Sequence, residues 1–351
     1  MAEPNGGPDM TGGPVRIRSG ARLHVGFRNL SVERSRLFGG IGVAIEHPVV
    51  SVTAHQARTV NCTHPRASRI AEKIVAHFGI DGIDLQVECD IPRHVGFGSG
   101  TQLTLAIYVA IARANGIVPR VREHAPFLGR GGRSGVGIAS FESGGFVVDA
   151  GHSTEEVVRA GSAGQGVPDV DEHEPIPDEW RFLLVRPSTE PGRSGTEETE
   201  SIERTIRRAD ASIADEIERI LSTQVLPGVR SDNIARFGRG LPRIDALTGT
   251  WFQSEQGDRY RRLGDQLISH LASTDAIYGW GQSSWGPLIY ALTTANESAA
   301  ATTEARMALT SVGINGVVDI VAPRNHGAEF DPVPANAQTC DSLTYYNQCQ
   351  N

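Results

Sequence analysis

Lysine is almost absent from this chain of 351 residues. Lys73 is the single lysine, so 32 of the 33 basic residues are arginine. A phosphate loop of the Walker type is excluded, because no Gly-Lys-Ser or Gly-Lys-Thr sequence occurs. Any chemical step that needs a lysine amine has Lys73 as its one candidate, and anion binding must otherwise use arginine or backbone amides.

Cysteine is scarce as well. The four cysteines, at positions 62, 89, 340 and 349, contain no Cys-x-x-Cys pair. This spacing indicates neither a zinc site nor a disulfide framework. Reduced cysteines are typical of cytoplasmic proteins, and we therefore expect a cytoplasmic location.

Long apolar runs and a positive net charge are also missing. No stretch approaches the ~18 apolar residues that a membrane span needs, and the Gly/Pro-rich residues 1–14 lack the apolar core of a signal peptide. The formal net charge of −8 argues against a broad nucleic-acid-binding surface. We expect small-molecule partners, and neither a membrane nor a nucleic acid.

Glycine, in contrast, is abundant. The chain has 40 glycines, a share above the usual ~7%, and many of them fall in residues 96–100, 129–137 and 279–286. The length allows two domains and a large core. Glycine clusters of this kind are typical of places where the backbone approaches a ligand closely or turns sharply.

Hydrophobic periodicity predicts a mixture of helices and strands. We expect a disordered leader over 1–14 and a loop or weak domain boundary over 151–178. The predicted strands begin at Val15 and lie within 39–52, 83–88, 146–149, 182–185 and 316–321. The predicted helices cover 66–78, 101–114, 197–221, 232–252, 258–272 and 296–312. Strands and helices alternate early, which indicates a mixed α and β protein with an open sheet.

The glycine loop at residues 92–102 carries the strongest chemical signal. It lies between a predicted strand and a predicted helix, and it reads Pro-Arg-His-Val-Gly-Phe-Gly-Ser-Gly-Thr-Gln. Glycines let backbone N–H groups approach an anion, and the following helix adds its free N–H groups and positive dipole end. The pattern therefore favours phosphate or pyrophosphate binding. The alternative is a tight strand-to-helix turn that binds nothing.

A second glycine element lies at residues 279–286. It holds Trp280 and Trp285 among three glycines. Flat rings beside glycines suit a ligand that contains a ring or a sugar. The alternative is a packed turn with tryptophans in the core.

Three segments in order resemble the motifs of the GHMP kinase superfamily, namely residues 19–26, 92–102 and 279–286. The details are most similar to the β-ribofuranosylaminobenzene 5′-phosphate synthases. This resemblance rests on Gly-Phe-Gly-Ser-Gly-Thr-Gln at 96–102, on the glycine-rich run 129–139, on Phe-Glu-Ser-Gly-Gly-Phe-Val-Val-Asp at 141–149 and on Gly-Gln-Ser-Ser-Trp-Gly at 281–286.

The resemblance implies an α+β fold of two domains and a homodimer. The expected N-terminal domain covers 15–178 and is similar to domain 2 of ribosomal protein S5. The expected C-terminal domain covers 179–325 and is ferredoxin-like, with an irregular tail over 326–351.

The implied activity joins phosphoribosyl pyrophosphate to 4-aminobenzoate or 4-hydroxybenzoate, with loss of CO₂ and pyrophosphate, in methanopterin biosynthesis. One departure separates the chain from the kinases: Gly137 stands where mevalonate-kinase-like members carry their catalytic aspartate. An ATP-dependent small-molecule kinase remains the alternative enzyme. A phosphate-metabolite sensor without turnover is the non-enzymatic alternative.

The chemistry of this reaction indicates candidate residues. Pyrophosphate needs amides, arginines or a divalent cation, and Mg²⁺ is expected, held mainly by the substrate phosphates. The candidate phosphate-binding residues are Gly96, Gly98, Ser99, Gly100, Thr101 and Gln102. The candidate substrate-binding residues are Arg22, His24, Arg130, Arg133, Ser134, Gln282, Ser283 and Trp285, and an arginine among them is expected to bind the benzoate carboxylate.

The identity of the catalytic group is left open by the sequence. Glu142, Asp149 and His24 are candidates, because they lie in the motif segments and can hold a metal or transfer a proton. Glu197, Glu198 and Glu200 are interpreted as stabilising a helix N-terminus and are given no catalytic role.

Overall fold

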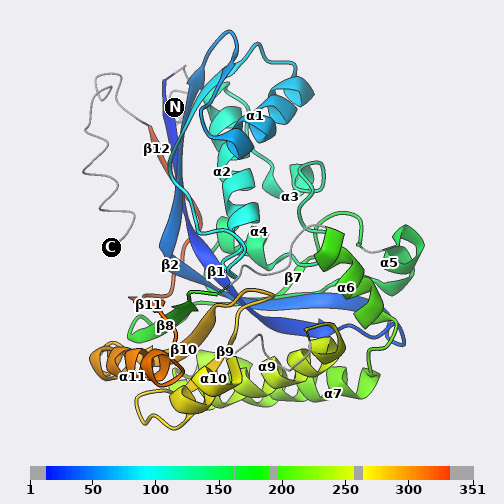
Figure 1. Cartoon of the computed structure of the whole chain (residues 1–351). Coiled ribbons are helices and arrows are strands. Elements are labelled where there is room, and N and C mark those ends of the chain that lie inside the picture. The colour runs from blue at the N-terminus through cyan, green and yellow to red at the C-terminus, as the bar shows by residue number, and fades with distance from the viewer. Residues whose placement is uncertain (1–12, 162, 190–195, 257–263, 333–351) are drawn as a thin grey trace, which may run out of the picture.

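The computed structural model describes residues 13–161, 163–189, 196–256 and 264–332. Its strands form two sheets, and helices cover them (Figure 1). The strands are β1 (Val15–Asn29), β2 (Arg36–Gln56), β3 (Val60–Asn61), β4 (Ile83–Cys89), β5 (Phe146–Asp149), β6 (His152–Ser153), β7 (Val170–Glu174), β8 (Trp180–Pro187), β9 (Gly279–Gln282), β10 (Ile289–Thr294), β11 (Gly316–Val321) and β12 (Glu329–Pro332).

The helices fall into an N-terminal and a C-terminal group. They are α1 (Pro65–Phe78), α2 (Ser99–Ala114), α3 (Val121–His124), α4 (Val136–Glu142), α5 (Thr154–Ala160), α6 (Thr196–Ile206), α7 (Ala211–Ile220), the π-helical turn η1 (Leu221–Val225), α8 (Leu226–Arg230), α9 (Ile234–Gln256), α10 (Gly264–Ala272) and α11 (Ser298–Ser311). In Figure 1, α1 and α2 lie beside the upper part of the long strands, and α7, α9 and α10 lie below.

The larger sheet is built on the long antiparallel pair β1 and β2. It has the order β12-β1-β2-β4-β3, and β5 and β6 pair with β2. The β1–β2 register shifts between Gly20 and Ala21 and again between His24 and Gly26. Such irregularities change the direction of nearby side chains, and these two flank the segment that carries Arg22 and His24.

The smaller sheet has the order β11-β8-β10-β9, with every pair antiparallel. In chain order this is 4-1-3-2, with helices between its first and second strands and α11 between its third and fourth. That arrangement is the ferredoxin-like split βαββαβ unit. The prediction of a mixed α+β fold with a ferredoxin-like C-terminal sheet is therefore confirmed.

Helix α2 is the central helix of the N-terminal half. Its residues from Gln102 to Ala112 are all buried, against the long strands and against α1 and α4. A helix that is apolar all round belongs in a protein core. This packing fixes the position and direction of its N-terminal end, which matters for the site described below.

Three segments differ from the sequence-based predictions. Residues 197–221 form two helices, because Asp210 accepts a hydrogen bond from Ser212 N at 2.8 Å and caps the start of α7. The expected loop over 151–178 contains β6, α5 and β7, and β7 pairs with β5. In the expected irregular tail, residues 329–332 form β12 and pair with residues 15–18 of β1.

Two further observations concern the cysteines and the helices. Cys62 is a free thiol, whereas Cys89 is disulfide-bonded, so the prediction of reduced cysteines is wrong for Cys89. Within the described residues, every helix is too short or too polar to cross a membrane.

Candidate active site

The glycine loop at residues 96–100 leads directly into the N-terminus of α2. Gly98 is the N-cap residue and adopts a left-handed conformation with φ 71°, which glycine reaches without a steric penalty. Thr101 N donates to Gly98 O at 3.0 Å. Ser99 and Gly100 lie one turn too early to donate within the helix, so their N–H groups are available to an anion.

Arginines surround this helix end. A pocket of about 400 Å³ opens over it and is lined by Arg22, Arg66, Arg93, Arg130 and the loop itself. A Cβ atom built on Gly100 would lie 3.2 Å from Nη2 of Arg66 and 3.3 Å from Nη1 of Arg130. Two guanidinium groups therefore lie directly beside the amides of the helix start, and together they make a strongly anion-attracting pocket.

Burial affects the charge state of two of these arginines. Burial lowers the pKa of Arg22 to about 10, an effect that Glu198 partly opposes. Burial and the nearby Arg66 lower the pKa of Arg130 to about 10. Both groups stay cationic at neutral pH, and each would gain free energy from an anionic ligand.

A second glycine loop, residues 129–134, faces an adjoining pocket of about 730 Å³. The two pockets share Arg22, Thr101, Arg130 and Trp285. Arg133 of this loop donates from Nη2 to Thr199 Oγ1 at 2.6 Å. The loop thus joins the N-terminal half to helix α6 of the C-terminal half.

Glu198 is the carboxylate that faces both pockets. Among the described residues, no other acidic side chain lines either of them. Its Oε1 lies 3.9 Å from Nη1 of Arg133. Burial raises the pKa of Glu198, and the positive charges of Arg133 and Arg22 partly oppose this effect. The site therefore pairs an excess of cations with one acidic group.

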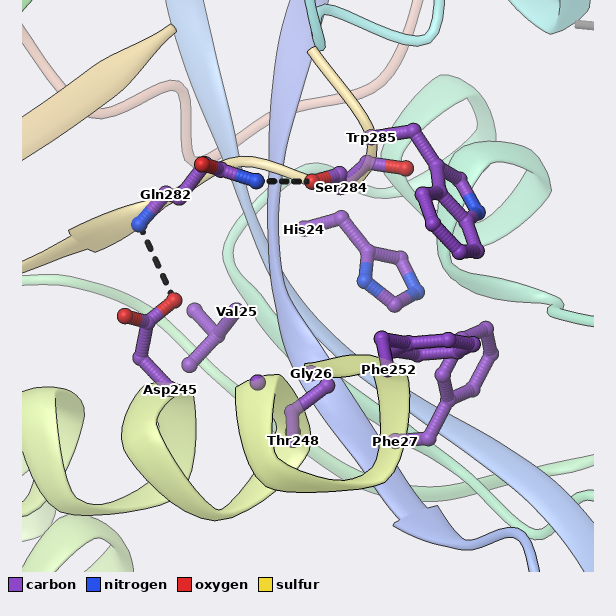
Figure 2. Close-up of a pocket in the computed structure, with 11 residues that line it drawn as sticks. His24, Val25, Gly26, Phe27, Asp245, Thr248, Phe252, Gln282, Ser284 and Trp285 are labelled. Carbon is purple, nitrogen blue, oxygen red and sulfur yellow. Dashed lines mark hydrogen bonds between the residues drawn. The ribbon is translucent and has the colours of Figure 1, made fainter. Parts of the chain in front are cut away.

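Aromatic rings form the wall on the β1 side of the larger pocket. The imidazole of His24 lies 4.7 Å from the ring of Phe27, and Phe252 lies 4.5 Å from Trp285. Figure 2 shows the rings of Phe27, Phe252 and Trp285 beside the imidazole, and Phe252 lines the small cavity between them. The cavity inside this cluster is only about 40 Å³. It is too small for a benzene ring, which occupies a cavity of roughly 150 Å³.

His24 is neutral at physiological pH. Burial, with a further contribution from Arg22, lowers its pKa to about 3. Its backbone N–H donates to Ser283 Oγ at 2.9 Å. A base this weak is poorly matched to accepting a proton near pH 7, which favours a packing and orienting role for the ring.

The lowered pKa of His24 predicts a loss of stability in acid. The unfolded chain takes up a proton near pH 6.5, and the folded chain does so only near pH 3. Stability is therefore unaffected above pH 6.5 and falls as the pH decreases from 6.5 towards 3. We expect His24→Gln to lose less stability between pH 7 and pH 4.5 than the parent chain, in urea unfolding at both values. His77→Gln, on the exposed face of α1, is the control, and an equal acid dependence in the His24 variant would contradict the prediction.

The structure brings most of the predicted site residues together. Arg22, Gly96, Gly98, Ser99, Gly100, Thr101, Arg130 and Trp285 line the phosphate-side pocket. His24, Arg133 and Ser134 line the larger pocket. Gln282 lines only the small cavity, and it donates from Nε2 to Ser284 O at 3.1 Å (Figure 2).

Two residues predicted to bind the ligand are buried and instead form hydrogen bonds within the protein. Gln102 is buried, accepts from Ser19 Oγ at 2.9 Å and donates to Gly137 O at 2.8 Å. Ser283 is buried and donates to Gly96 O at 2.8 Å. Neither residue lines the pockets, so both stabilise the position of the phosphate loop from the protein interior.

The structure also places two candidate catalytic carboxylates outside the pockets. Glu142 forms an ion pair with Arg122 at 3.1 Å, at the far end of α4. Asp149 is buried and accepts hydrogen bonds from Gly135 N at 2.7 Å and from Gly151 N at 2.9 Å. Each has the partners of a structural carboxylate.

Sequence reasoning missed three residues of the site. Arg66 and Arg93 line the phosphate-side pocket, and Glu198 lines both pockets. Arg93 lies inside the glycine-loop motif, so its position in the sequence could have identified it as a binding residue. Glu198 looks like any acidic residue in the first turn of a helix, and only the packing of α6 over the two loops reveals its location.

The chain shares sequence with known proteins over most of its length. The family model described as GHMP kinases N terminal domain matches residues 66–145. The β-ribofuranosylphenol 5′-phosphate synthase of Methanothermobacter thermautotrophicus is 31% identical over 294 residues, which cover 79% of this chain and 88% of the relative. The synthase of the same name from Archaeoglobus fulgidus is 31% identical over 290 residues, 80% of this chain and 88% of the relative.

Solved structures share the fold at low identity. Homoserine kinase from Cytophaga hutchinsonii has a TM-score of 0.60 and 17% identity, and the match covers 93% of this chain and all of that one. Mevalonate diphosphate decarboxylase from Staphylococcus aureus has a TM-score of 0.60 and 12% identity over 92% of this chain and 98% of that one. Likeness at this level of identity concerns the fold alone.

Proposed function

Because the chain belongs to the β-ribofuranosylphenol 5′-phosphate synthase family, within the GHMP superfamily, we propose that it joins phosphoribosyl pyrophosphate to 4-hydroxybenzoate. The products are β-ribofuranosylphenol 5′-phosphate, CO₂ and pyrophosphate, and the proposed pathway is methanopterin biosynthesis. The name of the relatives, with its phenol, favours 4-hydroxybenzoate over 4-aminobenzoate as the acceptor.

One observation carries the proposal most directly. The amides of Ser99 and Gly100 and the guanidinium groups of Arg22, Arg66 and Arg130 converge on one pocket. A leaving pyrophosphate gathers negative charge as its bond to ribose C1 breaks, and fixed N–H donors and cations stabilise that charge.

The acceptor ring has its place along the aromatic wall. Trp285 lines both pockets, and Phe27 and His24 line the larger one, so a ring stacked there lies next to the pyrophosphate pocket. The ring carbon that bears the carboxylate forms a bond to ribose C1 as the C1–O bond to pyrophosphate breaks. The ring–carboxylate bond then breaks, its electron pair restores the aromatic ring, and CO₂ leaves, so no ring proton has to be removed.

Gly137 supports this reaction over phosphoryl transfer from ATP. It lines the larger pocket, and a Cβ built on it would lie 3.2 Å from Cγ2 of Thr101. The position has no carboxylate and little room for one. A base for a substrate hydroxyl, which kinases of this superfamily place there, is missing.

Mg²⁺, a homodimer and a cytoplasmic location remain part of the proposal. Among the described residues, no group of three or more His, Cys, Asp or Glu side chains could hold a metal ion. A Mg²⁺ ion would therefore be held mainly by the substrate phosphates, where it would neutralise charge on the leaving pyrophosphate.

Release of ¹⁴CO₂ from carboxyl-labelled 4-hydroxybenzoate tests the proposal. With phosphoribosyl pyrophosphate and Mg²⁺ present, we expect CO₂ and pyrophosphate to form in a 1:1 ratio, and faster with 4-hydroxybenzoate than with 4-aminobenzoate. Omission of the sugar substrate is the control. Absence of CO₂ release would contradict the proposal. ATP-dependent phosphorylation of an alcohol would then indicate the kinase, and pyrophosphate binding without any turnover would indicate the sensor.

A further inference from the structure

The loop at residues 129–134 has the features of an anion site of its own. Gly129 and Gly131 have φ values of 72° and 94°, and the loop carries Arg130 and Arg133. Successive residues that alternate between left-handed and ordinary conformations can direct several N–H groups to one point, which makes a concave site for an anion.

Two carbonyl groups of this loop accept hydrogen bonds from residues outside the loop. The Gly131 carbonyl accepts from Nε2 of His152 at 2.8 Å, and the Gly132 carbonyl accepts from Gly164 N at 2.8 Å. In a planar trans peptide, the N–H points opposite to the C=O. The N–H groups of Gly132 and Arg133 are therefore turned away from His152 and Gly164, and both residues line the larger pocket.

The amides of residues 131–134 are also unused within the part of the chain that the structure describes. Among the residues that the structure describes, no acceptor is hydrogen-bonded to any of these four N–H groups. Nε of Arg130 is buried and likewise has no hydrogen-bond partner among those residues. A buried donor without an acceptor, such as Nε of Arg130, carries a free-energy cost that a bound anion would remove, and the amides are free to donate to the same anion.

We infer that residues 129–134 form a second anion subsite, which binds the 5′-phosphate of the sugar substrate. It is distinct from the pyrophosphate subsite at the start of α2. The identity of the sugar rests on the proposed function, whereas the anion subsite rests on the loop itself. Arg130 lies between the two subsites and lines both pockets, so one molecule with phosphates at both ends of a ribose would span them.

A phosphate monoester fits this loop better than the benzoate carboxylate, which was the expected ligand of Arg130 and Arg133. A dianionic phosphate offers three oxygens to converging amides and two arginines, whereas a carboxylate offers two oxygens and one charge. In addition, the carboxylate leaves as neutral CO₂. Clamping it with two arginines would stabilise the ground state relative to the transition state and slow the reaction.

Calorimetric titration with three separate probes tests the inference. Ribose 5-phosphate reports the 129–134 subsite, inorganic pyrophosphate reports the α2 subsite, and 4-hydroxybenzoate reports the acceptor site. Arg133→Met removes the charge of the loop and keeps its apolar stem. We expect this variant to bind ribose 5-phosphate at least about 10-fold more weakly, since one charge-assisted hydrogen bond contributes about 1.5–3 kcal/mol. Its affinities for pyrophosphate and 4-hydroxybenzoate should stay within about 2-fold of the parent.

Matched variants complete the test. Gly98→Val should show the reverse pattern, with pyrophosphate binding lost and ribose 5-phosphate binding kept. Arg243→Met, an exposed arginine of α9 that pairs with Glu216 at 2.7 Å, is the control and should change neither. Thermal unfolding verifies that each variant is folded. Arg133→Lys replaces Arg133→Met in the test if the methionine variant does not fold. It keeps the cation without the planar fork of donors, so we expect an affinity for ribose 5-phosphate between that of the parent and complete loss.

The outcomes separate this inference from the proposed function. Unchanged binding of ribose 5-phosphate to the Arg133 variants would overturn the subsite, even if CO₂ release is normal. Weakened binding of 4-hydroxybenzoate alone would assign the loop to the acceptor carboxylate and overturn it too. Arg133-dependent binding of ribose 5-phosphate in a protein that releases no CO₂ would support the subsite and contradict the synthase activity.

Discussion

Replacing Gly98 with valine is expected to raise the Kd for pyrophosphate by at least about 100-fold while the chain stays folded. Gly98 has a φ of 71°, and a Cβ built on it would lie 2.9 Å from Nε of Arg22. A β-branched side chain would therefore push the loop away from the start of α2 and displace Arg22. The loss corresponds to two charge-assisted hydrogen bonds of about 1.5–3 kcal/mol each.

A second glycine of the same helix supplies the control for backbone strain. Gly116 follows the C-terminal end of α2, has a φ of 69° and has open space around its Cβ position. Both Gly98→Val and Gly116→Val carry the penalty of about 1–2 kcal/mol for a left-handed residue. Only the first should lose pyrophosphate binding in calorimetry. Equal affinity in the two variants would remove the glycine loop from the site.

The glycine loop could be predicted from the sequence because its chemistry is local. The loop, the helix that follows it and the free amides between them are specified by about ten consecutive residues. The same holds for helix 66–78, which the structure has as Pro65–Phe78, and for strand 316–321. In each case the hydrophobic pattern acts over a few residues, in the helix together with Gly79 at its end, and tertiary contacts do not override it.

The carboxylates could not be assigned in this way, because their roles depend on contacts between distant residues. Asp149 lies in a motif and looks catalytic, yet the amides of the loop around Gly135 and of Gly151 surround it. Glu198 looks like an ordinary acidic residue at a helix start, yet its carboxylate lies 3.9 Å from Arg133, which is 65 residues earlier in the chain. The spacing of the two residues in the sequence does not indicate that they are close in the folded chain.

Glu198→Gln is expected to lower kcat by about 10²–10³-fold, the range seen when one preorganised electrostatic group is removed. Glu198 faces both pockets, between the α2 subsite and the 129–134 loop. In the proposed reaction, positive charge develops on the sugar as the bond from ribose C1 to pyrophosphate breaks, as it does in glycoside hydrolysis. A carboxylate in this position attracts that charge in the transition state.

The same substitution should not weaken binding of the substrate. Phosphoribosyl pyrophosphate, the proposed substrate, is a polyanion, so the negative charge of Glu198 opposes its binding in the ground state. We expect the Kd for this substrate to stay equal or to fall in Glu198→Gln, while kcat decreases. A lower kcat without weaker substrate binding is the signature of a group that acts only in the transition state. A merely structural role would instead lower kcat and also weaken substrate binding.

Single-turnover kinetics and calorimetry at several Mg²⁺ concentrations provide the measurement. Glu200→Gln, an exposed residue of the same helix, is the control and should match the parent chain. A Glu198→Gln protein whose rate recovers at high Mg²⁺ would identify Glu198 as a metal ligand, and would contradict direct stabilisation of the sugar. A rate that stays low at every Mg²⁺ concentration, with substrate binding intact, is the result that the charge arrangement predicts, because in that arrangement the cations bind the phosphates and Glu198 stabilises the ribose.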